Sequence, residues 1–161
     1  TLIGGSVGLN SIGRNSVSGD GRYVVFTSSA VLSPDDANGT SDVFLYDRTT
    51  EAITLISRNF NDTGSAGGNS FNAVISFDGS HVAFISDAND LVSGMTSNPI
   101  QADNIFVWNR TTKNITLVSR NEDGTSGTED SSAPTISDNG SRIAFQTQAR
   151  LASTDPSIVP D

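Results

Sequence analysis

The sequence predicts an all-β protein that is built from repeated, four-stranded antiparallel sheets. A pattern ending in Asp-Gly or Asn-Gly recurs at Asp20, Asp78 and Asn139, so successive copies start 58 and 61 residues apart. The segments between these turns are short and rich in β-branched and aromatic residues. No window of about a dozen residues keeps the 3.6-residue apolar period of an amphipathic helix, so almost no helix is expected.

The Asp-Gly and Asn-Gly pairs predict a hairpin at the start of each repeat. Such pairs favour type I′ turns, because both central residues of that turn need a positive φ angle. The first strands are therefore expected at 14–18, 72–76 and 133–137, and the second strands at 22–28, 81–86 and 142–147.

A second recurring motif predicts the other two strands of each sheet. The segment 43–50, VFLYDRTT, matches 105–112, IFVWNRTT, and the segment 53–59 matches 115–121. Third strands are expected at 42–47 and 104–109, and fourth strands at 53–58 and 115–120, after an Arg-Thr-Thr turn. The segment 1–3 matches a fourth strand of a preceding repeat, which brings the expected total to eleven strands.

The repeat divides the chain, taken as one array over 1–161, into about two and three-quarter sheets. Residues 1–13 are expected to hold the fourth strand of a preceding sheet and a linker, followed by units at 14–59 and 60–121 and half a unit at 122–161. A twisted four-stranded sheet has two apolar faces and cannot bury both alone. Apolar residues of the strands are therefore expected between stacked sheets: Val24, Phe26, Phe44, Tyr46, Val82, Phe84, Phe106, Trp108, Ile143 and Phe145.

Three short motifs resemble a known repeat. They are Ser-Gly-Asp-Gly at 18–21, Val-Phe-Thr-Ser at 25–28 and Asp-Val-Phe-Leu-Tyr-Asp at 42–47, and the copies at 76–79 and 83–86 are closer still. They resemble the TolB-like, WD-like β-propeller repeat family. The resemblance implies four-stranded blades around a central axis, and two and three-quarter blades imply an incomplete propeller. It says little about activity, because propellers host binding, scaffolding and enzymatic roles.

Composition excludes several classes of protein. The 161 residues contain no cysteine, which excludes a disulfide scaffold, a thiolate zinc site and a thiol nucleophile. The net charge is −9 with only nine Lys and Arg residues, so phosphate backbones would be repelled and nucleic-acid binding is not expected. No apolar run approaches the roughly 20 residues of a membrane span. Scarce lysine and abundant Ser, Thr and Asn favour an extracellular or periplasmic protein of the cell envelope.

One loop carries a pattern typical of a metal site. Between the second and third strands of the first complete repeat, the carboxylates of Asp36 and Asp42, the Asn38 side chain and the Thr40 carbonyl offer oxygen atoms at alternating positions. Such a set suits a hard cation, so Ca²⁺ is the one cofactor that the sequence suggests. The alternative is an Asx-turn loop, in which Asp and Asn side chains bond to their own backbone.

No catalytic residue is expected. His81 is the only histidine, and it is expected at the place of Arg22 and Arg142 at the start of a second strand, which favours an exposed structural residue. Acid–base chemistry needs a positioned partner, and the sequence indicates none. A Gly-x-Ser-x-Gly nucleophile elbow is also missing from the sequence.

The leading functional hypothesis is a non-enzymatic, extracytoplasmic binding or assembly module. The connections at 59–71 and 121–132 would present acidic residues to a protein partner, and incomplete edge blades would allow copies to self-associate into a homo-oligomer. The acidic residues are Asp62, Glu122, Asp123, Glu129 and Asp130. One alternative is a propeller fragment of a larger hydrolase or of a TolB-like envelope protein, and another is a calcium-stabilised structural repeat protein.

Overall fold

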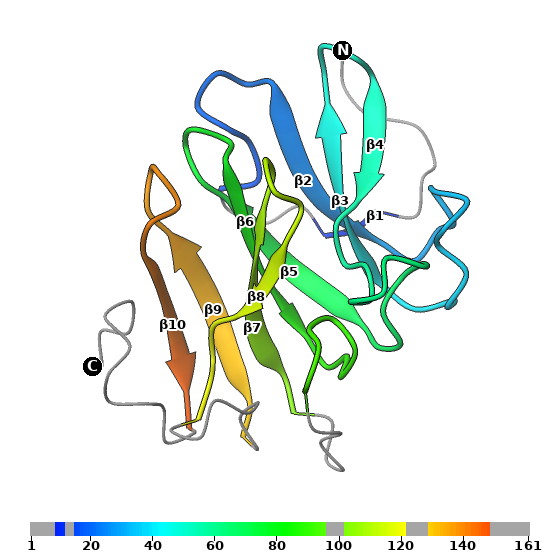
Figure 1. Cartoon of the computed structure of the whole chain (residues 1–161). Helices are drawn as coiled ribbons and strands as arrows, with labels where there is room; N and C mark the ends of the chain where they lie inside the picture. Colours follow the sequence, from blue (N-terminus) through cyan, green and yellow to red (C-terminus); the bar gives the residue numbers. More distant parts are fainter. Residues whose placement is uncertain (1–8, 12–14, 96–101, 122–128, 149–161) are drawn as a thin grey trace.

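The computed structural model describes residues 9–11, 15–95, 102–121 and 129–148, which form strands and turns without a helix. No helix in this described part is therefore long and apolar enough to cross a membrane. Three antiparallel sheets lie side by side (Figure 1), with the strand orders β1-β2-β3-β4, β5-β6-β7-β8 and β10-β9. We call them blade 1, blade 2 and blade 3. The strands are β1 (Leu9–Ser11), β2 (Tyr23–Ser28), β3 (Asp42–Asp47), β4 (Ala52–Leu55), β5 (Ser70–Ile75), β6 (His81–Ser86), β7 (Asn104–Asn109), β8 (Ile115–Leu117), β9 (Ser131–Ile136) and β10 (Ile143–Thr147).

The all-β fold and the four-stranded antiparallel blades are confirmed. Strands β3, β6 and β7 have the residue bounds that the sequence predicts, because turn residues bound each short, continuous apolar run. Residues 1–3, the expected fourth strand of a preceding blade, lie outside the described residues. The proposed division of the chain at residues 14, 60 and 122 stays a prediction.

The first strand of each blade differs from the expectation because it contains an irregularity. In blade 1 the expected strand at 14–18 is replaced by β1 at Leu9–Ser11 and a single bridge between Val17 and Val24. In blade 2 the register shifts between Phe71 and Val74, where Asn72 has a φ of 50°. Such a bulge bends the strand and raises its twist, and it cannot be read from alternation alone.

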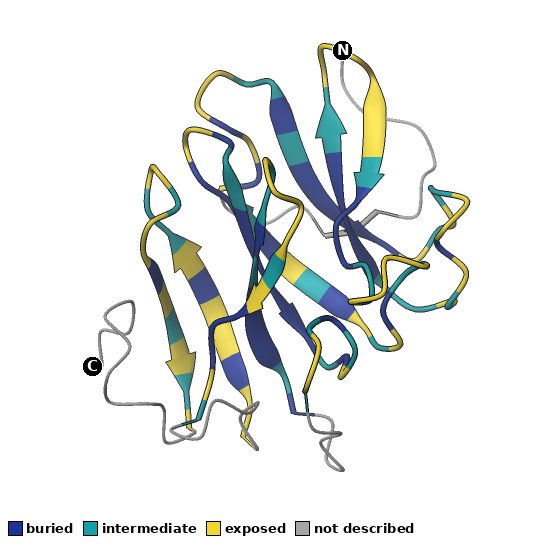
Figure 2. Cartoon of the chain, viewed as in Figure 1, coloured by how far each residue is buried: buried dark blue, intermediate teal, exposed yellow. Residues whose placement is uncertain are grey.

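Apolar side chains fill the two spaces between the blades, and Figure 2 colours most of β2, β6 and β7 as buried. One face of blade 2 packs on Val25 and Val43 of blade 1. On this face Val82, Phe84 and Phe106 are fully buried. The opposite face of blade 2, with Ala83, Ile85 and Ile105, packs on Ile143 and Phe145 of blade 3. Of the residues expected between sheets, those of blades 2 and 3 lie there, but Phe26, Phe44 and Tyr46 of blade 1 form a separate cluster with Leu55 and Leu32. Sequence reasoning left out the residues of the facing sheets that supply the partners: Tyr23, Val25, Val43, Leu45, Ala83, Ile85 and Ile105.

The outer face of blade 3 is polar, unlike the matching faces of the other two blades. On this face Ser132, Thr135, Ala144 and Gln146 are exposed. The matching face of blade 1 buries Val25 and Leu45 instead, and that of blade 2 buries Ala83 and Ile85. The described part of blade 3 therefore offers no apolar surface on which another blade would pack.

Candidate functional site

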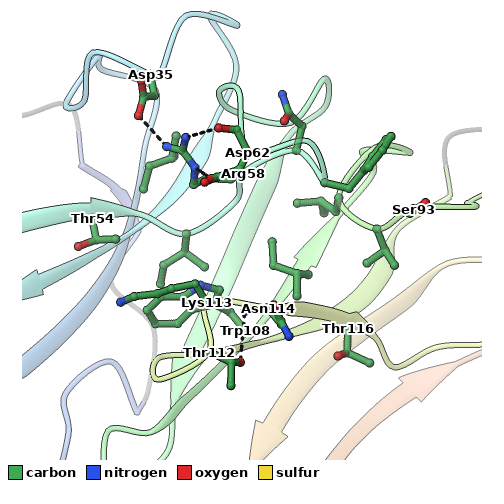
Figure 3. Close-up of a pocket in the computed structure, with 17 residues that line it drawn as sticks. Asp35, Thr54, Arg58, Asp62, Ser93, Trp108, Thr112, Lys113, Asn114 and Thr116 are labelled. Carbon is green, nitrogen blue, oxygen red and sulfur yellow. Dashed lines mark hydrogen bonds and ion pairs between the residues drawn. The ribbon is translucent and has the colours of Figure 1, made fainter.

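A groove runs between the outermost strands of blades 1 and 2 (Figure 3). It encloses about 710 Å³ and is lined by β4, β8, the turn at 112–114 and the connections at 58–62 and 91–93. Strands β4 and β8 are each paired on one side only, as the last strands of their sheets. The groove therefore lies between two sheet edges whose outer backbone groups face away from their own sheet.

The floor and rim of the groove combine apolar and polar groups. Trp108 on β7 is 2% exposed, and Lys113 Nζ lies 4.9 Å from the centroid of its ring. Phe60 on the rim is 50% exposed, while Leu91 is buried. Lys113 has a φ of 64°, a left-handed conformation that tight turns select. A cation over an indole ring and an exposed phenyl ring are both suited to recognition of a ligand.

The charged residues at one end of the groove are engaged with each other. Arg58 Nη1 lies 2.8 Å from Asp35 Oδ2, and Arg58 Nε donates to Asp62 Oδ1. Hydrogen bonds to Asp35 and then Asp62 raise the pKa of the Arg58 guanidinium. Because these three groups hold one another in ion pairs, they orient the loop and are poorly placed to transfer protons.

Three of the four residues of the expected metal loop lie in the connection between β2 and β3, and the fourth, Asp42, is the first residue of β3. Asp36 is 4% exposed and Asp42 is fully buried. Asn38 Oδ1 accepts a hydrogen bond from Thr40 N at 2.9 Å, which is an Asx turn. Asn38 Nδ2 donates to Ala66 O at 2.7 Å, and Thr40 Oγ1 donates to Gly68 O at 3.0 Å. The loop thus has the Asx-turn backbone, and its role in binding metal stays a prediction.

Asp42 has the most perturbed environment in this loop. Ser57 Oγ donates to its Oδ1 at 2.6 Å, while its Oδ2 has no hydrogen-bond partner among the described residues. Burial raises the pKa of the Asp42 carboxyl to about 6, the hydrogen bond from Ser57 lowers it, and the neighbouring Asp36 carboxylate raises it. The described residues contain no group of three or more His, Cys, Asp or Glu side chains that could hold a metal ion, so any cation here would depend on two carboxylates and on neutral oxygens.

His81 is held as a structural residue at the border of blades 2 and 3. Its Nδ1 lies 2.7 Å from Ser80 Oγ and its Nε2 lies 2.9 Å from Asn109 Nδ2. The strand register pairs His81 with Asn109 and Tyr23 with Asp47. His81 is therefore equivalent to Tyr23, and equating it with Arg22 from the sequence was wrong by one position.

Sequence reasoning selected only one residue of the groove lining as a candidate for binding. That residue is Asp62, an acidic loop residue, whereas Trp108 was expected only as an apolar residue between sheets. Glu129 is exposed, and Asp130 Oδ1 accepts from Asp103 N at 3.0 Å. Glu122 and Asp123 lie outside the described residues. Trp108 and Lys113 were missed because the repeat marks strand and turn positions alike in both blades; their counterparts in blade 1 are Tyr46 and Glu51.

Solved structures that are similar to this chain include a TolB protein and the tricorn protease, whereas no model of a protein family and no curated protein matches it. TolB from Acinetobacter baumannii superposes with a TM-score of 0.53 at 22% identity, over 92% of this chain and 28% of that one. The tricorn protease superposes with a TM-score of 0.50 at 16% identity, over 82% of this chain and 10% of that one. These likenesses show a TolB-like β-propeller fold. The chain spans about a quarter and a tenth, respectively, of the lengths of these proteins.

Proposed function

We propose that this chain is a non-enzymatic, extracytoplasmic protein-binding module of TolB-like repeats. In this proposal the groove between β4 and β8 receives an extended segment of a partner protein. The observation that carries the proposal is the groove itself, an open cavity of about 710 Å³ between two edge strands of adjacent blades.

The chemistry of the groove supports a peptide ligand. An extended chain can bond to the free backbone groups of an edge strand and place alternate side chains in flanking pockets. Leu55, Leu91 and Ile115 supply apolar lining, and Thr54 and Thr116 supply hydroxyls along the two strands. The titratable groups Arg58, Asp35 and Asp62 are already ion-paired, which favours binding over catalysis at this site.

Peptides selected against the 161-residue chain from a random displayed library test the proposal. Trp108 is the only tryptophan and lies in the groove lining, so a peptide bound there is expected to change its fluorescence. Phe60→Ser and Lys113→Asn are expected to weaken binding about tenfold or more, the effect of losing an anchor residue. Asn is chosen at 113 because it tolerates the left-handed conformation.

Val31→Ser is the matched control for the groove variants. Val31 is 69% exposed and lies outside the groove lining, so its replacement removes an exposed apolar side chain elsewhere. Its affinity for the selected peptides is expected to equal that of the parent chain. Peptides that bind equally well to all four proteins, or a failure to select any peptide, would count against a peptide-binding groove.

A second candidate function is self-association. Within the described residues β10 pairs with β9 alone, so its other edge can accept a strand from a second copy. The polar outer face of blade 3 disfavours stacking of whole blades, which restricts copies to joining edge to edge. Light scattering after size exclusion decides this: a multiple of 16.8 kDa supports it, and a single species at 16.8 kDa excludes it.

The enzymatic alternative places this chain in a larger hydrolase, with the catalytic groups outside these residues. The likeness to a solved protease structure is the reason to consider this alternative. The sequence of the gene that encodes the chain distinguishes the hydrolase from the binding module. An adjoining α/β pattern with a nucleophile elbow would support the hydrolase, and its lack, together with an export signal, would support the binding module.

A further inference from the structure

A buried carboxylate in blade 1 lacks a partner for one of its oxygens. Asp42 is the first residue of β3 and is fully buried. Its Oδ1 accepts from Ser57 Oγ at 2.6 Å, but its Oδ2 finds no donor in the described part of the chain. The second carboxylate, Asp36, is 4% exposed and lies close enough to act on the charge of Asp42.

The same position in blade 2 shows how a neutral residue satisfies this site. Asn104 begins β7 as Asp42 begins β3, and Ser119 Oγ donates to its Oδ1 at 2.8 Å. Its Nδ2 donates to Ala102 O at 3.0 Å. The residue that corresponds to Ala102 in blade 1 is Thr40. The amide in blade 2 therefore donates to a carbonyl two residues earlier, whereas the carboxylate in blade 1 has no hydrogen to donate.

A buried carboxylate beside a second carboxylate is costly unless its charge is compensated. Desolvation and like-charge repulsion both disfavour the ionised form. Two changes remove the cost: a proton shared between Asp36 and Asp42, or a cation between them. The loop offers two further oxygen atoms, from Asn38 and Thr40, which a shared proton does not need and which a hard cation would use.

We propose that the loop between β2 and β3 binds one Ca²⁺ through the carboxylates of Asp36 and Asp42, the Asn38 side-chain carbonyl and the Thr40 backbone carbonyl. Ca²⁺ accepts six to eight oxygen ligands in flexible geometry, with water completing the shell. Asn38 Oδ1 accepts one hydrogen bond from Thr40 N, and a carbonyl oxygen has a second lone pair for a cation.

The loop is held in shape by contacts that do not use the proposed ligand atoms. Asn38 Nδ2 donates to Ala66 O at 2.7 Å and Thr40 Oγ1 donates to Gly68 O at 3.0 Å. Asp36 N donates to Ser33 O at 3.0 Å. These bonds hold the loop against the connection that leads to β5. Because the loop is already ordered, binding a cation costs less conformational entropy.

Calorimetric titration of CaCl₂ into the chelator-treated 161-residue chain tests the proposal. One site is expected, together with a rise of the melting temperature by about 5–10 °C at a Ca²⁺ concentration of about 100 times Kd. Asp42→Asn introduces the residue that blade 2 uses, and it is expected to abolish both responses while the variant remains folded in chelator. Asp138→Asn, which removes one exposed charge in the hairpin of blade 3, is expected to keep both.

The outcomes separate the alternatives. A concentration of about 10 mM Ca²⁺ exceeds the Kd of weak extracellular calcium sites. No heat and no thermal shift at that concentration would overturn the proposal and favour a proton shared between Asp36 and Asp42. Binding that survives in Asp42→Asn would place the cation elsewhere and overturn it too. An equal response to Mg²⁺ would overturn the assignment to Ca²⁺. Should Asp42→Asn fail to fold, Asp36→Asn gives the same test, since it removes the other carboxylate.

Discussion

The hairpin glycines of blades 2 and 3 each have two roles, and the sequence reveals only one of them. Gly79 has a φ of 69°, but Asp78 before it does not have a positive φ, so the expected type I′ turn is wrong; the turn is closed instead by Gly79 N, which donates to Ser76 O at 2.9 Å. A Cβ at Gly79 would also lie 2.8 Å from Cδ2 of Tyr23 in blade 1. Gly140 has the same φ of 69° and faces the ring of His81 in blade 2. The second role depends on the neighbouring blade, and no local pattern reports it.

Gly79→Ala is expected to destabilise the chain more than Gly94→Ala does. Both replacements put Ala at a positive φ, of 69° and 80°, which costs about 1–2 kcal/mol. Only Gly79 also meets a neighbouring ring, since nothing lies within 4 Å of a Cβ at Gly94, and that overlap adds about 1–3 kcal/mol. Urea unfolding measures both free energies, and equal losses would contradict a contact between blades at Gly79.

Asp47 is expected to stay ionised in acid that protonates an ordinary aspartate. Arg22 Nε and Nη2 donate to its two oxygens at 2.9 and 2.8 Å, and this bidentate hydrogen bonding lowers the pKa of Asp47. The stabilisation from this pair is therefore present above the unfolded value of 3.8 and is lost as pH falls toward the lower folded value.

Carboxyl NMR titration of Asp47 in two arginine variants checks this assignment. Arg22→Gln is expected to return the pKa of Asp47 toward its ordinary range, because it removes both donors. Arg48→Gln is the control, since Arg48 Nη1 donates instead to Gly21 O at 2.8 Å. A midpoint that responds to Arg48→Gln and ignores Arg22→Gln would refute the cross-strand pair.

At the scale of elements, a serine ends the outer strand of each complete blade. Val43 N donates to Ser57 Oγ at 3.1 Å in blade 1, and Ile105 N donates to Ser119 Oγ at 3.0 Å in blade 2. A hydroxyl thus takes the place of a backbone carbonyl in the ladder. This explains why β4 and β8 end at Leu55 and Leu117, before the expected ends at 58 and 120.

Ser57→Ala and Ser119→Ala are each expected to cost about 1–3 kcal/mol in the free energy of unfolding. Each replacement removes the hydroxyl that bonds to a buried backbone N–H and to a buried side-chain oxygen. The desolvation cost of these two groups exceeds the net contribution of one hydrogen bond. Ser29→Ala, at an exposed position just after β2, is the control and is expected to change stability by less than about 0.5 kcal/mol. Losses as small as the control's would show that the serines do not close the strands.

Alternation and turn chemistry predict regular elements well and irregular ones poorly. Strands β3, β6 and β7 follow from short, continuous apolar runs between clear turns. The bulges in the first strands do not, since Ala133 with a φ of 51° carries no residue preference for that conformation. The sequence shows that Asp42 belongs to a loop rich in oxygen ligands. It does not show the hydrogen bond between Asp42 and Ser57, because these residues are 15 apart in the sequence and meet only in the folded sheet.

At the scale of the whole molecule, the groove exists only because two blades are side by side. Arg58 and Lys113 reach it from different repeats, and the repeat pattern gives neither residue a special place. Blade packing aligns the two edge strands, and the fully buried Phe84 and Phe106, with ring centroids 5.8 Å apart, hold that packing. The propeller fold was therefore predictable from the sequence, whereas the candidate binding site was not.

Amide hydrogen exchange of the 161-residue chain, with and without a selected peptide, shows where a partner binds. Added protection is expected in the outer strands and turn that line the groove, at 52–56 and 112–117. None is expected in the hairpins at 18–21 and 77–80, which lie at the inner strands. Protection confined to those hairpins would contradict the claim that partners bind in the groove between blades 1 and 2.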